Sequence, residues 1–126
     1  MKLLLQLVLA MALVAGAIAI LARMHLGSCV DLPMHDEPSP DGRFVASRFE
    51  HTCTGSTMAT TEVSLRAAAL PFDTPAPEDV VLIASGRPPV DLSWRDGRTL
   101  VAKTAGKVVE QRPSWRSVGV VIQAVR

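Results

Sequence analysis

Residues 3–22 form a run of 20 residues that is apolar throughout except for Gln6. At a rise of about 1.5 Å per residue, a helix of this length spans the roughly 30 Å hydrocarbon core of a bilayer. We therefore predict a single uncleaved membrane anchor over residues 1–23, with residues 3–22 in contact with lipid. The remaining chain, about 100 residues, is then a small domain held at a membrane surface.

A cleaved signal peptide is an alternative interpretation of the same segment. Lys2 supplies the basic start, and residues 17–19 (Ala-Ile-Ala) supply a small-x-small cleavage site. Cleavage there would leave Ile20 at a new apolar terminus, and the apolar run is longer than a signal core requires. The uncleaved anchor is the better match to this length.

A lipoprotein signal is a third interpretation, because residues 26–29 (Leu-Gly-Ser-Cys) resemble the small-residue run that precedes a lipidated cysteine. Against it, Arg23 and His25 stand between the apolar core and Cys29, where such signals stay apolar. Lipidation of Cys29 would also leave Cys53 without a partner. The sequence leaves this interpretation and the cleaved signal peptide open beside the anchor.

Cys29 and Cys53 are the two cysteines of the chain, and both follow the anchor. Two thiols in a small domain outside the cytoplasm predict a disulfide, since those compartments are oxidising. The bridge closes a loop of about 25 residues and contributes about 3 kcal/mol by the chain-entropy estimate. We accordingly predict a bacterial cytoplasmic-membrane protein, single-pass, with its C-terminal domain in the periplasm. Two unrelated thiols in a cytosolic domain would require the opposite topology.

The charge and aromatic content argue against nucleic acid as a partner. Without Lys2 and Arg23, 11 basic residues remain against 12 acidic ones, which gives a formal charge of −1 for the outer part. The whole chain has no tyrosine, two tryptophans and three phenylalanines, too few for a base-stacking surface. The three histidines match no zinc-ligand spacing with the cysteines. We therefore predict no metal and no cofactor.

Beyond the anchor, the patterns predict an all-β domain. Residues 27–40 are polar, acidic and Pro-containing, and residues 24–40 are interpreted as a stalk or strap; residues 41–126 form the extracytoplasmic β domain. Alternating or β-branched stretches predict six or seven short strands, at residues 43–51, 61–67, 80–84, 90–95, 98–103, 108–112 and 118–125. Three prolines mark residues 68–78 as a loop. The expected fold is a small antiparallel meander, as a curled sheet or two layers, after one transmembrane helix.

The clearest local prediction is a hairpin around Asp96 and Gly97. A two-residue Asp-Gly loop favours a type I′ turn. It would pair Trp94 with Thr99 and Leu92 with Val101, which makes one face apolar. It would also set Arg95 opposite Arg98, an unfavourable like-charge pair that a four-residue loop would relieve.

Residues 39–46 (Ser-Pro-Asp-Gly-Arg-Phe-Val-Ala) and 91–102 (Asp-Leu-Ser-Trp-Arg-Asp-Gly-Arg-Thr-Leu-Val-Ala) resemble a single blade of a Tol- or WD-type β-propeller. The layout also resembles a family of small uncharacterised bacterial membrane-anchored proteins. These carry a cysteine, a Ser-Pro-Asp-Gly-Lys/Arg strand start and a Cys-Gly-Ala-Thr-Thr-like loop, which here reads Cys-Thr-Gly-Ser-Thr at 53–57. The resemblance covers about residues 29–102. It implies the Cys29–Cys53 bridge and a β-rich outer domain, and it implies no activity.

Candidate site residues are few. His51 lies near Ser47 and Ser56 in sequence, but no nucleophile elbow surrounds either serine, so we predict no catalytic residue. Trp94 falls on the predicted core face. Trp115, in a Pro-containing connection between Arg112 and Arg116, is the candidate for a partner contact or a membrane-interface position.

The function that these observations favour is a non-catalytic binding module anchored in the membrane, whose partner is another protein at the membrane or in the periplasm. One version is an immunity-type inhibitor of a toxin that reaches the periplasm. The alternatives are a structural accessory subunit of an envelope membrane complex and an envelope hydrolase.

Overall fold

The computed structural model describes residues 1–26 and 28–126. Within them are one α-helix, nine strands and one turn of 3-10 helix, named here in chain order: α1 (Lys2–Leu26), β1 (Cys29–Pro38), β2 (Phe44–Cys53), β3 (Thr60–Ala67), η1 (Pro77–Asp79), β4 (Val80–Ser85), β5 (Val90–Asp96), β6 (Thr99–Thr104), β7 (Val108–Gln111), β8 (Ser114–Trp115) and β9 (Val118–Ala124).

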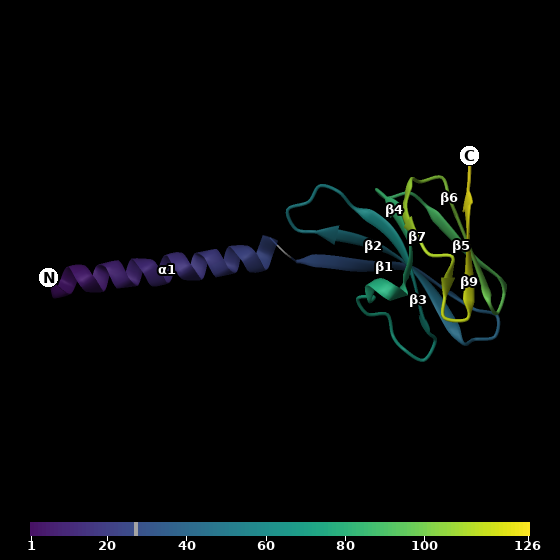
Figure 1. The fold of residues 1–126 in the computed structure, drawn as a ribbon, viewed down its shortest axis with the longest axis horizontal. Helices are drawn as coiled ribbons and strands as arrows, with labels where there is room; N and C mark the ends of the chain where they lie inside the picture. Colours follow the sequence, from purple (N-terminus) through teal and green to yellow (C-terminus); the bar gives the residue numbers. More distant parts are fainter. Residues whose placement is uncertain (27) are drawn as a thin grey trace.

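Helix α1 projects from the β domain as a separate rod (Figure 1). Its apolar part, Lys2–Met24, is 23 residues long, and none of it is buried against the rest of the chain. At about 1.5 Å per residue this part is about 35 Å long, enough to cross a bilayer. The exposed apolar side chains of α1 have a compatible environment in lipid, which supports membrane anchoring.

Strands β1, β2, β3, β4 and β7 form one sheet in that order, and every neighbouring pair is antiparallel. The second sheet has the order β5-β6-β9-β8. Its β6 and β9 run parallel, because the chain leaves β6, adds β7 to the first sheet and returns through β8. The predicted all-β class and antiparallel layering are confirmed, while this one parallel pair departs from a simple meander.

The two sheets pack face to face around one apolar core. Successive side chains of a regular strand point to opposite faces, so alternate residues reach the space between the sheets. At the irregularity in β4 two neighbours, Val81 and Leu82, both join the core. The core residues drawn from both sheets are Phe44, Ala46, Val63, Leu65, Val81, Leu82, Val90, Leu100, Ala102, Trp115, Val118 and Val120. The Arg48 guanidinium also bridges the sheets, since Nη1 donates a 2.8 Å hydrogen bond to the backbone carbonyl of Val90.

Strand β2 is buried on both faces, which explains its imperfect alternation in sequence. Phe44 and Ala46 face the second sheet, while Phe49 is 1% exposed on the opposite face. There the proline-rich segment between β3 and η1 covers the sheet, and the Phe72 ring packs on Phe49 at 5.5 Å between centroids. This segment is the loop predicted from its prolines, with one turn of 3-10 helix, η1, at its end.

The β5–β6 hairpin forms at the predicted position, but its register is different. Trp94 pairs with Leu100 and Leu92 with Ala102, so the predicted partners Thr99 and Val101 are wrong by one residue. The ladder is interrupted between Trp94 and Asp96, which pairs with Thr99 across the turn residues Gly97 and Arg98. This bulge removes Arg95 from the position opposite Arg98, and so avoids the like-charge pair.

Most of the segment interpreted as a stalk or strap is strand β1, which the sequence pattern did not predict. β1 forms the edge of the first sheet and pairs with β2 alone in that sheet. Its two prolines, Pro33 and Pro38, are tolerated because an edge strand leaves one row of backbone groups unpaired. The register shifts between Pro33 and His35, which places a bulge at Met34.

Candidate functional site

The start of β1 and the end of β2 bring together both cysteines of the chain with a histidine and an aspartate. Cys29 and Cys53 are directly opposite each other in the ladder, with Cα atoms 3.9 Å apart, and are joined by a disulfide. The predicted bridge is therefore present. It staples the edge strand β1 to the sheet three residues after α1 ends at Leu26.

His51 and Asp31 lie beside the disulfide as a second cross-strand pair. His51 Nδ1 is 2.5 Å from Asp31 Oδ1, and the Asp31 side chain is only 7% exposed. The other ring nitrogen, Nε2, lies 3.4 Å from Cys53 Sγ. One imidazole therefore connects a mostly buried carboxylate to a disulfide sulfur.

A hollow of about 240 Å³ adjoins this group on the outer face of the first sheet. Asp31, His51 and Phe49 line one part of it, and Glu62 and Glu110 contribute two more carboxylates. Glu62 is 8% exposed, and its Oε1 accepts a 2.7 Å hydrogen bond from the Thr60 hydroxyl. The hollow is thus acidic, with a histidine at its rim.

The Cys29, His51 and Cys53 side chains have donor atoms within 4.8 Å of one another, so the fold gathers residue types that bind zinc. In the disulfide state the two sulfurs are bonded to each other and are not thiolates, which are the form that binds metals. With the bridge closed, the imidazole is the one conventional donor of the three. The sequence expectation of no metal remains a prediction.

The two hydrogen-bond partners of His51 among the described residues are Asp31 and Cys53, not a serine hydroxyl. Ser47 Oγ instead donates a 2.6 Å hydrogen bond to Asp36, and Ser56 Oγ is engaged with Met58 in its own turn. The hydroxyls considered from sequence for a hydrolase are therefore not activated by this histidine.

The structure corrects the expectation for Trp115. Its side chain is in the core, the residue is 5% exposed, and its ring stands edge-on to Phe44 at 5.4 Å between centroids. Indole Nε1 donates a 2.8 Å hydrogen bond to Asp79 Oδ1, so the polar atom is also satisfied. A buried ring of this kind packs the core and is not displayed to a partner.

The two arginines around Trp115 have different surroundings. The Arg116 guanidinium lies 4.5 Å from the Trp115 ring centroid, and its backbone φ is 50°. Arg112 is 3.9 Å from a Glu110 carboxylate oxygen, a long ion pair at an exposed position. Both flank a core residue, so the three predicted contact residues do not form one exposed aromatic anchor. Trp94 is partly buried against the core, on the face predicted for it.

A second polar cluster lies farther along β1 and β2. Asp36 accepts hydrogen bonds from the Ser47 hydroxyl at 2.6 Å and from Arg66 Nη2 at 3.1 Å, and Arg66 also contacts the Ser47 hydroxyl. Partial burial opposes ionisation of Asp36, but these hydrogen bonds and the Arg66 charge outweigh it and lower the pKa of its carboxyl. The cluster is a stabilising cross-strand network.

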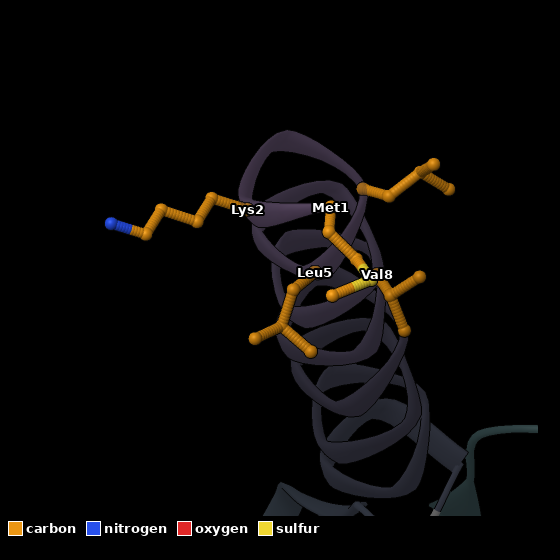
Figure 2. A pocket seen from close by; sticks show the side chains of 5 residues that line it. Met1, Lys2, Leu5 and Val8 are labelled. Carbon is orange, nitrogen blue, oxygen red and sulfur yellow. The ribbon is translucent and has the colours of Figure 1, made fainter.

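The first two turns of α1 carry a different kind of hollow, lined by Met1, Lys2, Leu4, Leu5 and Val8. In Figure 2 the Lys2 amine extends away from the apolar side chains of Met1, Leu5 and Val8. A hollow of this composition on an isolated apolar helix suits lipid chains. Its polar groups are amines, and the Lys2 ammonium can reach the headgroup region.

The sequence does carry a signal for the Asp31–His51 pair, although it is visible only once β1 is recognised as a strand. Asp31 follows Cys29 by two residues, and His51 precedes Cys53 by two. When the cysteines are opposed in an antiparallel ladder, the residues two positions inward from each must also be opposed on the same face. Extending a strand through Cys29 is therefore enough to find the pair.

No protein-family model, no curated protein and no solved structure matches this chain. The resemblance to anchored bacterial proteins and to a propeller blade therefore stays a prediction.

Proposed function

We propose that this chain is a membrane-anchored, extracytoplasmic binding module that holds an extended segment of another protein along the free edge of β1. The observation that carries the proposal is a row of three apolar side chains on this edge strand. Val30, Leu32 and Met34 are 62%, 55% and 56% exposed. Proteins protect an open sheet edge with charged residues, prolines and bulges, and the second half of β1 has all three. The first half of β1 is the part open to addition of a strand.

Backbone groups at the start of β1 are oriented for such an addition. Thr54 N–H donates to the Ser28 carbonyl, and Cys29 and Cys53 approach to 3.9 Å between Cα atoms. Cys29 and Asp31 therefore occupy non-hydrogen-bonded positions, from which their N–H and C=O groups point away from β2. A partner strand would gain backbone hydrogen bonds from these groups and specificity from the apolar row.

A partner protein suits this edge better than a second copy of the chain. β1 leads away from the end of α1 (Figure 1), so two copies anchored in one membrane would present their β1 strands in parallel. Antiparallel pairing of two identical β1 edges requires a two-fold axis perpendicular to the strands. This axis would place the two α1 helices at opposite ends of the paired domains, where they could not enter the same membrane. An extended segment of another chain has no such restriction.

The disulfide supports the extracytoplasmic side for this domain. Disulfides form and persist outside the cytoplasm, whereas thiols are kept reduced inside it. The uncleaved anchor would then hold the domain at the outer surface of the cytoplasmic membrane, with the start of β1 at the membrane-proximal end.

Site-specific photo-crosslinking of the full-length protein in intact membranes tests the proposal. A photoreactive residue at Val30 or Leu32 is expected to capture one protein in stoichiometric yield, and Leu32→Lys should abolish capture from position 30. The matched controls are probes at Met58 and Leu70, which are 66% and 59% exposed on other segments.

Equal capture of the same protein from Met58 or Leu70 would contradict an edge-specific site. A chain that crosslinks to its own copy would assign the edge to self-association. Capture only of integral membrane subunits, and only from probes in α1, would instead favour the structural accessory subunit.

A further inference from the structure

We propose that the Cys29–Cys53 disulfide is a thiol-exchange site in which an external thiol attacks Cys29 and the His51–Asp31 pair assists the departure of Cys53. The reactant is a low-molecular-weight thiol or a dithiol protein. This is a redox activity, separate from strand addition at the same edge, and it follows from the different surroundings of the two sulfurs.

The two cysteines differ in access and in neighbours. Cys29 is exposed at the beginning of the edge strand, whereas Cys53 is half-buried. Cys53 Sγ lies 3.4 Å from His51 Nε2, and among the described residues that contact is its one hydrogen-bond partner. Exchange requires access to the attacked sulfur and stabilisation of the leaving one, and each cysteine meets one requirement.

Asp31 prepares His51 for this role. Its carboxylate oxygen lies 2.5 Å from Nδ1 and holds the ring with Nε2 directed at the sulfur. In the imidazolium form both ring nitrogens carry a proton, so Nε2–H donates to the leaving sulfur while the Asp31 carboxylate balances the charge. Asp31 contacts neither sulfur, so it acts as a positioning residue for His51.

The exchange proceeds in two balanced steps. An external thiol releases its proton to solvent, and its sulfur forms a bond to Cys29 Sγ. The Cys29–Cys53 bond breaks, and its electron pair stays on Cys53 Sγ beside the imidazolium, which took its Nε2 proton from solvent. A second external thiolate then attacks the external sulfur of the mixed disulfide. Cys29 leaves as a thiolate that is protonated by solvent, and the two external thiols depart joined as a disulfide, having supplied two electrons.

The test uses the full-length oxidised protein in detergent micelles, with glutathione as the probe. Reactions are stopped with acid, free thiols are alkylated, and mass spectrometry locates glutathione on Cys29 or Cys53. Glutathione is expected on Cys29, with Cys53 alkylated. His51→Gln should slow reduction by about tenfold, because exchange is faster when the leaving thiolate is stabilised, and should weaken the preference for Cys29.

His35→Gln is the matched control. His35 also contacts a carboxylate, Glu37, at 2.9 Å, and it lies on the same strand as Asp31 with no sulfur contact. This variant should react at the wild-type rate. Asp31→Asn should slow exchange in the wild-type background and have no added effect in the His51→Gln background, which a merely structural role for Asp31 would not produce.

Equal rates for wild type and His51→Gln, or glutathione located mainly on Cys53, would overturn the proposal. If Asp31→Asn slowed exchange by the same factor in the His51→Gln background as in the wild type, the two residues would act independently. That result would overturn the proposed coupling of Asp31 to His51. Urea unfolding midpoints of the oxidised variants, followed by tryptophan fluorescence, separate these effects from loss of folding.

Discussion

Trp94 Nε1 donates a 2.9 Å hydrogen bond to the backbone carbonyl of Glu37, which lies 57 residues earlier in the chain. This contact joins the edge strand β5 of one sheet to the edge strand β1 of the other. It closes one side of the two-sheet core and gives the indole N–H a partner at a partly buried position. The disulfide and this bond therefore fix β1 near its two ends.

Replacing Trp94 by Phe tests the hydrogen bond between Trp94 and the Glu37 carbonyl. Phe keeps an aromatic ring but removes the donor, so we expect the free energy of unfolding to fall by about 1 kcal/mol. Urea unfolding of the detergent-solubilised chain, followed by Trp115 fluorescence, measures this. The control is Arg95→Gln at the exposed bulge, expected within about 0.5 kcal/mol of wild type. Equal unfolding free energies for the two variants would mean that the Trp94–Glu37 hydrogen bond does not stabilise the fold.

Cys53→Ser tests the disulfide that joins β1 to β2. The two cysteines are 24 residues apart, so loss of the bridge should lower the free energy of unfolding by about 3 kcal/mol. The freed Cys29 is exposed and should react with maleimide without reductant. Wild-type protein is expected to remain unlabelled until it is reduced, and equal labelling of both proteins would show that the bridge is absent.

Gly106→Ala tests a close approach between two turns. A Cβ added at Gly106 would stand 2.4 Å from Pro88 Cγ, in a rigid ring that cannot swing aside. Overpacking of this kind costs about 1–3 kcal/mol of unfolding free energy. Gly119→Ala is the matched control, because its added Cβ would meet only the Arg98 carbonyl oxygen at 3.7 Å. Equal unfolding midpoints for the two variants would contradict the close approach of Gly106 to Pro88 in solution.

The lowered pKa of Asp36 predicts that the stability of the fold depends on pH in the acid range. Burial opposes its ionisation, but hydrogen bonds from Ser47 and Arg66 and the Arg66 charge lower its carboxyl pKa below the ordinary 3.8. A carboxyl with a lowered pKa in the folded state stabilises the fold above its unfolded pKa and loses that contribution as pH falls through the folded value. Wild type should therefore exceed Asp36→Asn in stability at neutral pH.

That difference should shrink as the pH falls below the ordinary carboxyl pKa of about 3.8. Unfolding midpoints of the two proteins across the acid range measure it. Because the Asp36 side chain is half-exposed, solvent screens the pair and the whole difference should be modest. A gap that is constant with pH would exclude Asp36 ionisation as its cause.

Much of the fold could be predicted from local patterns. Period-two alternation located β3, a short apolar run located β4, and a β-branched run located β9, because those strands bury one face or lie in the core. The sequence did not predict edge strand β1. Its apolar residues alternate but are exposed, and Pro33 interrupts the pattern. Its pairing with β2 depends on contacts between distant residues.

Part of the candidate site could also be predicted from the sequence, and part depends on the tertiary structure. Cysteine count and the position of the anchor predicted the Cys29–Cys53 bridge, but the Asp31–His51 pair needed the register of β1 against β2. Trp115 was expected to be exposed because Pro113 and two arginines surround it. It is buried because the Asp79 carboxylate accepts its indole N–H and its ring packs edge-on against Phe44.

Short segments of the chain are enough to specify the apolar helix, the strand-rich β domain and the cysteine pair. Each of these follows from the composition or the period of a segment. The bulged hairpin register, the parallel β6–β9 pair, the free edge of β1 and the imidazole beside one sulfur emerge only when the strands assemble. These features depend on which strands meet and in what register, and that is set by burying one shared core across segments far apart in the chain.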